Sequence, residues 1–215
     1  PSLLLMLIFM ALTMVVVAGG VAKGIGRWSK RLLPAMIVTL VLLSGYVLTL
    51  DGASKGLAVY LIPDVSKILS TELVFNAMGA AFFSLSLGVG TMLIYGSYIS
   101  DEEHLPTLGA QVALVDVGIA VLAGFLILPA MYVAAERGVM IFNDAGGLLS
   151  EDTLIFTVLP ALFESMNESG TLLALAFFGL MSIAALTSSI SMLEVPVSFL
   201  VERFNWGRTQ AAFVA

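Results

Sequence analysis

Hydrophobic residues in this chain gather into long runs separated by short polar stretches. The five longest runs cover approximately residues 2–22, 32–50, 73–98, 105–135 and 170–201. A helix needs about 20 apolar residues to cross a bilayer, whereas a membrane β-strand needs only about 10 and alternates in polarity. The pattern therefore predicts an all-α fold, a polytopic transmembrane helical bundle with about five membrane-spanning segments.

Composition indicates that lipid is the main environment of this bundle. Hydrophobic residues make up 60% of the chain and charged residues only 11%, with a mean hydropathy of +1.07. A soluble domain carries about 25% charged residues. The net charge of −6 comes with no basic stripe, which argues against a nucleic-acid partner. Cysteine is absent, which excludes a disulfide framework, a thiolate metal site and a cysteine nucleophile.

The loops set the expected orientation and domain organisation. Basic residues on one side, expected to be cytoplasmic, are Lys23, Arg27, Lys30, Arg31, Arg203 and Arg208, against Lys55, Lys67 and Arg137 on the other. The outer loop 136–169 contains a turn signal at 143–147 and Pro160, so we expect short capping helices there. The chain starts at Pro1 and is apolar at once. We therefore expect residues 1–215 to be one transmembrane domain fragment, completed by N-terminal and C-terminal helices of the same protein.

The third apolar run contains a pattern that weakens a helix. Residues 82–90 read FFSLSLGVG, with two serines followed by two glycines. Each glycine costs about 1 kcal/mol in a helix interior, and serine side chains compete with the backbone for hydrogen bonds. An unwound backbone at membrane depth must line a cavity or be buried in protein, as in the broken helices of secondary transporters. Close helix packing through small residues is the alternative interpretation.

Asp116 lies well inside the fourth apolar run. An acidic residue at that depth costs about 3 kcal/mol or more and is by default a functional-site candidate. Three states are open to it: protonated and hydrogen-bonded, paired with a basic residue, or bound to a cation. No lysine or arginine lies in any apolar core of the chain.

The fifth run places small and hydroxylated side chains on one helix face. Ala184, Thr187, Ser188 and Ser191 follow i, i+3, i+4, i+7 spacing. Hydroxyl and carbonyl oxygens are hard ligands that suit an alkali cation, whereas back-bonding to the preceding turn is the common alternative. Glu194 is a second intramembrane acid, for which the sequence indicates no partner.

The sequence contains no motif that indicates an enzyme active site. His104 is the only histidine and lies in a predicted loop, which argues against a Ser-His protease and a multi-histidine metal site. The glycine-rich stretch 19–26 follows no strand and lacks Walker spacing. We expect no enzyme.

Taken in order, these clusters resemble the neurotransmitter:sodium symporter family, which includes bacterial amino-acid transporters. The matching stretches are 19–25 leading to Pro34, 61–64, 81–90, 95–98, 122–124 leading to Pro129, 159–163 and 186–190. The resemblance implies that the chain covers helices four to eight of twelve in a larger inverted-repeat transporter fold. It also implies sodium ions as the coupling ions.

The resemblance implies roles for individual residues. The substrate-binding set would be Phe83, Ser84, Ser86, Val89, Ser188 and Met192. The sodium ligands would be Ser84, Asp116, the Ala184 carbonyl, Thr187 and Ser188. The gate residues would be Phe83 as an aromatic lid, Tyr98 and Glu202, the last paired with an arginine outside this chain.

Two departures from relatives refine the expected function. Asp116 stands where relatives have an asparagine ligand, and Ala120 stands where they carry a glutamate or a chloride-binding serine. We hypothesise that Asp116 ligates sodium and supplies the fixed negative charge, which predicts chloride-independent transport. Val89 and Met192 leave room for a sizeable apolar side chain. The expected function is therefore sodium-coupled symport of a neutral, hydrophobic amino acid by alternating access, in a bacterial inner membrane.

Two other classes of function stay open on the sequence alone. Asp116 and Glu194 could form the proton relay of a proton-coupled exchanger or channel. The chain could also be a structural bundle subunit with no site of its own. Sodium-dependent binding of a small amino acid would separate the symporter from both.

Overall fold

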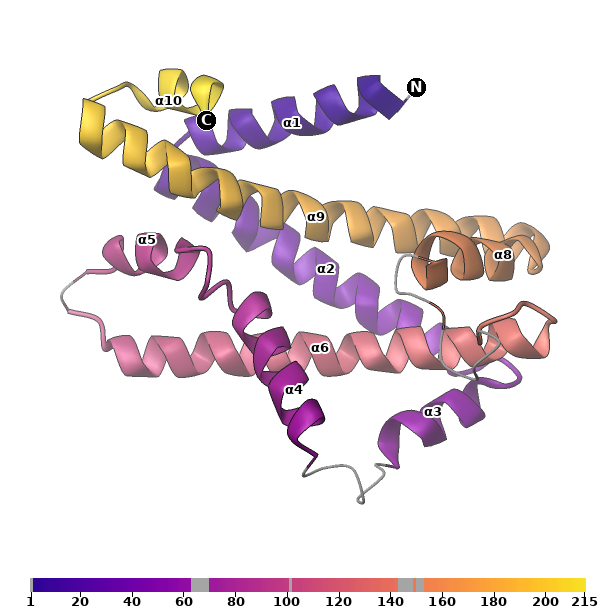
Figure 1. Ribbon diagram of the computed structural model, residues 1–215. Coiled ribbons are helices and arrows are strands. Elements are labelled where there is room, and N and C mark those ends of the chain that lie inside the picture. Colours follow the sequence, from indigo (N-terminus) through magenta and orange to yellow (C-terminus); the bar gives the residue numbers. More distant parts are fainter. Residues whose placement is uncertain (1, 63–69, 101, 143–148, 150–152) are drawn as a thin grey trace. The chain divides into compact units, whose positions relative to one another are not determined.

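A computed structural model describes residues 2–62, 70–100, 102–142, 149 and 153–215 of the chain. Within these residues the regular structure is helical, with no β-strand, as the apolar runs predict (Figure 1). The predicted turn at 143–147 lies outside the described residues.

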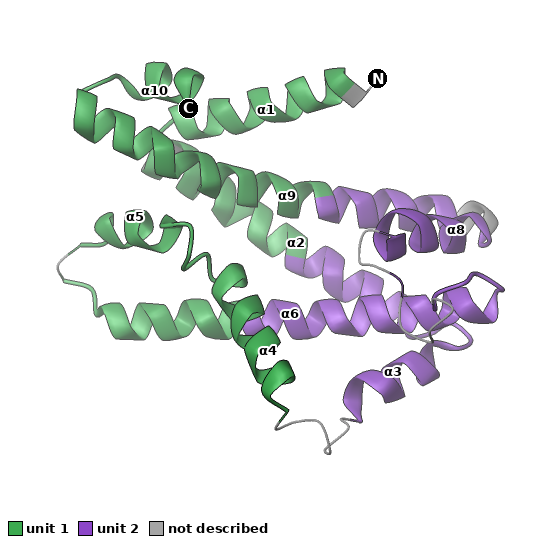
Figure 2. Ribbon diagram, in the orientation of Figure 1, with its two compact units in different colours: residues 1–36, 69–116, 182–215 green, residues 37–68, 117–181 purple. Residues whose placement is uncertain are grey.

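The chain forms two compact units, each built from several segments (Figure 2). Unit 1 comprises residues 1–36, 69–116 and 182–215, and unit 2 comprises residues 37–68 and 117–181. The three longest helices each contribute residues to both units; they are α2 (Gly26–Val47), α6 (Leu105–Glu136) and α9 (Asn167–Phe204).

Three helices of the described chain are long and apolar enough to cross a membrane. They are α2, α6 and the part of α9 from Gly170 to Phe204. Helix α2 begins at Gly26, six residues before the apolar run that predicted it, because residues 27–31, three of them basic, are already helical. A hydropathy pattern detects the apolar length of a helix and misses a charged first turn of this kind.

The first apolar run ends as a regular helix earlier than expected. Helix α1 covers Ser2–Ala18, Gly20 adopts a positive φ of 81°, and a π-helical turn η1 covers Val21–Ile25. A side chain at Gly24 would collide with the carbonyl oxygen of Val16, so the backbone approaches itself closely here. Positive φ and this close approach both require glycine.

The core of unit 1 is an apolar cluster around α1, α9 and α10 (Arg208–Val214). Its fully buried members are Val16, Val17, Ile25, Ile190, Val197, Ala211 and Ala212. Ala211 and Ala212 allow α10 to pack closely against α1. The segment after α9 is therefore held beside the end of α1.

The third apolar run is broken, as its serines and glycines predict. Helix α4 (Thr71–Ser84) ends at Ser84, residues 85–90 form consecutive turns, and α5 (Thr91–Ser97) begins after them. Ser86 and Gly90 have positive φ angles of 53° and 82°, which no helix can contain. The unwound stretch therefore separates two short helices in the middle of the apolar run.

Unit 2 packs the short helix α3 (Ala53–Leu61) against α6. Gly56 touches the backbone of Leu128 and Pro129, and the Tyr60 ring lies over Gly124. The Tyr60 hydroxyl donates to the Val121 carbonyl at 3.1 Å. The next part of α6 along the chain contains its buried residues, which include Leu126, Ala130, Met131, Val133 and Ala134.

Two short helical pieces lie in the loop where capping helices were predicted. A π-helical turn η3 covers Leu154–Val158 and α8 covers Leu159–Glu164, with Pro160 in the first turn of α8. The two pieces are continuous, since the Leu159 N–H donates to the Leu154 carbonyl across their junction. Arg137 binds the carbonyl and hydroxyl of Ser165 at 3.2 Å, just after α8 ends.

Candidate functional site

The break in the third run positions Ser84 against the acid of the fourth run. Ser84, the last residue of α4, donates its hydroxyl to both carboxylate oxygens of Asp116, at 2.7 and 2.9 Å. None of the ion pairs formed by the described residues includes Asp116. Of the three states left open by the sequence, pairing with a basic residue therefore finds no support within the described chain, and a hydroxyl partner is present.

A cavity of about 550 Å³ adjoins this pair within unit 1. Its walls come from α4, the unwound turn, the start of α5, α6 and the hydroxylated face of α9. The lining residues are Phe83, Ser84, Ser86, Val89, Thr91, Asp116, Thr187, Ser188, Ser191 and Met192. Every predicted substrate-binding residue thus faces one space, together with Thr91 and Ser191, which the resemblance did not include.

Helix α9 supplies a strip of hydroxyls to this cavity. Thr187 donates to the Ala184 carbonyl at 2.8 Å, and Ser191 donates to the Thr187 carbonyl at 3.2 Å. Back-bonding, the common alternative for such residues, is therefore present. The same bond holds the Thr187 hydroxyl oxygen beside the Ala184 carbonyl oxygen, so the two can become neighbouring ligands when the hydroxyl proton turns away.

The chemistry of these groups is that of a hard-cation site. The oxygens comprise one carboxylate, several hydroxyls and a main-chain carbonyl. No group of three or more His, Cys, Asp or Glu residues gathers anywhere in the described part of the chain, so it offers no transition-metal ligand cluster. Oxygen donors of mixed charge suit an alkali or alkaline-earth ion.

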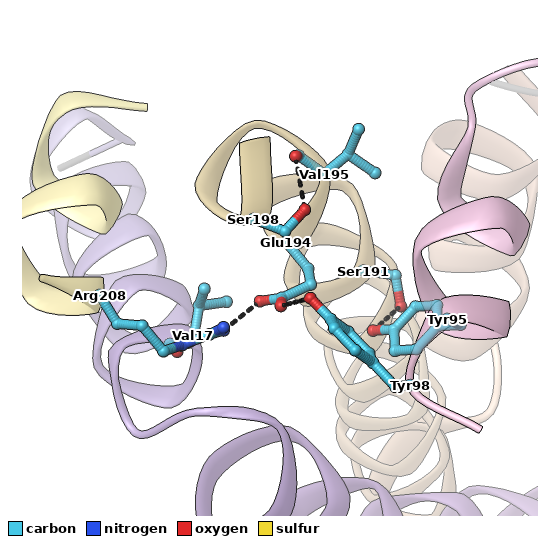
Figure 3. A network of polar contacts seen from close by, with 8 residues as sticks. All are labelled: Val17, Tyr95, Tyr98, Ser191, Glu194, Val195, Ser198 and Arg208. Atoms are coloured by element: carbon cyan, nitrogen blue, oxygen red, sulfur yellow. Dashed lines mark hydrogen bonds and ion pairs between the residues drawn. The ribbon is translucent and has the colours of Figure 1, made fainter. Parts of the chain in front are cut away.

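A second polar network continues from the cavity along α5 and α9 (Figure 3). Tyr95 donates to Ser191 at 3.3 Å, and Tyr98 donates to Glu194 at 2.6 Å. Arg208 then closes the other side of Glu194 with an ion pair of 2.5 Å (Figure 3). These contacts join the second half of the broken helix to α9, and α9 to α10.

Glu194 is fully buried, and Arg208 is the partner that the sequence did not indicate. The same guanidinium nitrogen also donates to the Val17 carbonyl at 3.3 Å, near the end of α1. Burial lowers the pKa of Arg208, but the neighbouring Glu194 carboxylate outweighs it, so the pKa lies above its ordinary value and the guanidinium stays charged. The buried carboxylate is therefore neutralised by a permanent cation.

Two of the predicted gate residues lie away from the cavity lining. Tyr98 belongs to the Glu194 network, and Glu202 is exposed near the end of α9. Phe83 lines the cavity but is 84% exposed, and α4 as a whole contributes no buried residue. The roles expected for all three residues stay predictions.

The comparisons with known proteins agree on one family. A family model described as the sodium:neurotransmitter symporter family matches residues 2–214. An uncharacterised sodium-dependent transporter of Bacillus subtilis, YhdH, is 39% identical over 89% of this chain and 40% of its own length. One from Haemophilus influenzae is 36% identical over 95% of this chain and 42% of its length.

The solved structures include a similar fold. The crystal structure of MhsT in complex with L-phenylalanine matches with a TM-score of 0.77 and 41% identity, over 96% of this chain and 44% of MhsT. The chain thus spans less than half the length of each of these three proteins.

Proposed function

The chain belongs to the sodium:neurotransmitter symporter family, and from this premise we propose that it supplies part of the ion and substrate site of a sodium-coupled transporter. The family consists of transporters, not enzymes, and the long apolar helices of this chain fit a multi-pass membrane protein. The proposed activity is symport of a neutral amino acid by alternating access, with the remaining helices of the site supplied by the rest of the protein.

The observation that carries this proposal is the Ser84–Asp116 contact at the helix break. We assign the first sodium to Ser84 and Asp116, with Asp116 as the charged ligand. A cation 4 Å from a carboxylate gains about 4 kcal/mol at an effective dielectric constant of about 20. That offsets the burial cost of about 3 kcal/mol for an acidic residue at this depth. A bound cation thus explains why an acid is kept in an apolar helix.

The second sodium is assigned to α9. Its ligands are the Ala184 carbonyl and the hydroxyls of Thr187 and Ser188. When the ion arrives, the Thr187 hydroxyl releases its 2.8 Å bond to Ala184, so that both oxygens direct lone pairs to the ion. The exchange replaces a neutral hydrogen bond by ion coordination and needs no backbone change.

The substrate is assigned to the rest of the cavity. Phe83, Val89 and Met192 offer apolar contact, and Ser86 and Ser188 offer hydroxyls from the unwound turn and from α9. Among the described residues that line the cavity, Asp116 is the one with an ionisable side chain. Because a sodium ion would neutralise it, the lining favours a neutral amino acid with a sizeable apolar side chain. The solved complex of MhsT holds L-phenylalanine, which supports this size class.

We further propose that transport is independent of chloride. Asp116 provides a fixed negative charge beside the first sodium, and Ala120, one turn later on α6, offers no hydroxyl to a chloride ion. A second anion would add repulsion without a donor to hold it.

The proton-coupled alternative is not supported. The relatives are named sodium-dependent transporters, and Glu194 is held by Arg208 and Tyr98, which leaves it in an ion pair instead of a proton relay.

A purely structural subunit is disfavoured by the cavity itself. The exposed apolar face of α4 fits coverage by lipid or by the remaining helices of the transporter. Because the similar transporters include bacterial ones, we propose the bacterial cell membrane as the location.

The test uses the full-length transporter, purified and reconstituted in liposomes. Uptake of a labelled large neutral amino acid is expected to require an inward sodium gradient and to persist when gluconate replaces chloride. Asp116→Asn should weaken sodium affinity at least about tenfold, or about 1.4 kcal/mol. The matched control is Glu103→Gln, the same carboxylate-to-amide change at an exposed residue outside the cavity, which should leave sodium affinity unchanged.

Either of two results would refute the assignment of Asp116. One is a sodium affinity that Asp116→Asn leaves unaltered. The other is a loss of wild-type uptake when chloride is removed. Uptake driven by a proton gradient in the absence of sodium would refute the proposed function as a whole.

A further inference from the structure

Helices α5 and α9 lie side by side in a fixed register. The bonds Tyr95–Ser191 and Tyr98–Glu194 both join residues separated by 96 positions (Figure 3). Tyr95 lies on α5 and Tyr98 directly follows it, and each donates to a residue of α9, Ser191 or the buried Glu194. The two rings also contact each other edge to face, with centroids 6.3 Å apart. We call this arrangement of Tyr95 and Tyr98 against α9 the tyrosine ladder.

The same register places Thr91 at the next level of the ladder, opposite Thr187. Thr91 is one helical turn before Tyr95, so it lies on the same face of α5. At this level both residues are threonines, so neither extends a ring toward the other helix, and both line the cavity. The ladder therefore lacks a ring where the cavity begins.

Thr91 is also the one cavity residue whose buried hydroxyl has no hydrogen-bond partner among the described residues. Thr91 is 5% exposed. The hydroxyls of Ser84, Thr187 and Ser191, in contrast, are all engaged. Buried hydroxyls without partners are rare and call for an explanation, such as a group that arrives with a ligand. Rotation about χ1 exchanges the hydroxyl and the methyl group of a threonine, so Thr91 can turn its hydroxyl toward a ligand without a change in the backbone.

We propose that an aromatic ring of the substrate occupies the level of Thr91 and Thr187, where the tyrosine ladder has no ring. Thr91 then forms a hydrogen bond with a polar group at the edge of that ring. The substrate class is then an aromatic amino acid with a ring-borne hydrogen-bonding group, tyrosine in preference to phenylalanine. The ring packs edge to face on Tyr95, as Tyr95 does on Tyr98, and its hydroxyl bonds to Thr91. This inference rests on the proposed function, because it concerns the same cavity.

The physical reason for the preference is the unpaired hydroxyl. A phenylalanine ring would cover Thr91 and shut out water without offering a partner. A tyrosine ring has nearly the same shape, and its hydroxyl group can form a hydrogen bond with the Thr91 hydroxyl. Sites with a polar group placed for a substrate hydroxyl discriminate strongly against the analogue that lacks it, because the protein group is left unpaired.

The experiment measures equilibrium binding of L-tyrosine and L-phenylalanine to the full-length transporter in saturating sodium. Wild-type protein should bind tyrosine about tenfold more tightly, equivalent to about 1.4 kcal/mol. Thr91→Val, which keeps the shape of the side chain, should bring the two affinities within about twofold, because it weakens tyrosine binding and removes the unpaired hydroxyl that disfavours phenylalanine. Thr91→Ser should retain the preference. Thr71→Val is the matched control, since Thr71 is likewise the first residue of its helix, is exposed, and lies outside the cavity lining.

Retained phenylalanine binding by Thr91→Val shows that the variant is folded, so a change in the tyrosine affinity is interpretable. Equal affinities in the wild type, or a tyrosine preference that survives Thr91→Val, would overturn the inference and leave the proposed function standing. A lack of sodium-dependent binding of either amino acid to the wild type would overturn both.

Discussion

The buried pair between Glu194 and Arg208 gives the sharpest stability prediction. The change is Arg208→Met, which keeps an unbranched apolar stem and removes the guanidinium. Glu194, whose side chain is 0% exposed in the wild-type structure, would lose its ion pair and keep only the bond from Tyr98. The Val17 carbonyl near the end of α1 would lose its bond from Arg208 as well.

The magnitude follows from burial. Breaking a buried ion pair by removing one partner costs about 3–5 kcal/mol, because the other charge is left uncompensated. The Arg208 side chain is 26% exposed and Tyr98 remains, so we expect the lower end, about 3 kcal/mol. Glu194→Gln should cost about 1 kcal/mol, because the amide still accepts from Tyr98 and the partly exposed Arg208 can turn its charge toward water. The double variant should cost about 2 kcal/mol, less than the sum of the single changes, because the unpaired charge has gone.

The assay is equilibrium unfolding of the full-length protein in mixed micelles, followed by tryptophan fluorescence. Arg203→Met is the matched control, because Arg203 is exposed at the end of α9, and it should change the free energy of unfolding by less than about 0.5 kcal/mol. Additive effects of Glu194→Gln and Arg208→Met, without a coupling energy of about 2 kcal/mol, would refute the role of the pair.

Two further predictions concern glycines, one required by its backbone conformation and one by the close approach of a side chain. Gly90→Ala, at a φ of 82°, should destabilise the protein by about 1–2 kcal/mol and weaken substrate binding, because it disfavours the backbone that ends the unwound turn; a variant as stable as wild type would contradict this. Gly124→Ala should cost about 1–3 kcal/mol, because its methyl group collides with the Tyr60 ring, and Tyr60→Ala should relieve most of that cost in the double variant, as measured by the same unfolding assay.

The sequence predicted the fold class and the break in the third run for local reasons. Two serines and two glycines within residues 82–90 disfavour a helix wherever they occur, and Ser86 and Gly90 do leave the helical region. The cavity residues on α9 were predictable in the same way, since helical spacing alone places Thr187 and Ser191 on one face.

The polar network was not predictable because it depends on contacts between separate elements. Glu194 and Arg208 are 14 residues apart, and the chain leaves α9 between them through Asn205, whose φ is 53°. No helical spacing relates residues across such a turn. Thr91 was missed for another reason: in a sequence it is one threonine among many, and only the structure shows that its hydroxyl is buried without a partner.

We propose above that two pairs of residues hold sodium ions beside a shared cavity: Asp116 with Ser84, and Thr187 with Ala184. The most direct measurement is a crystal structure of the full-length protein with thallium in place of sodium, in which anomalous scattering locates the ions. We expect one peak in contact with the Asp116 carboxylate and the Ser84 hydroxyl, and a second beside the Ala184 carbonyl and the Thr187 hydroxyl. Substrate-bound crystals with no ion in contact with Asp116, and with Thr187 still bonded to Ala184, would contradict it.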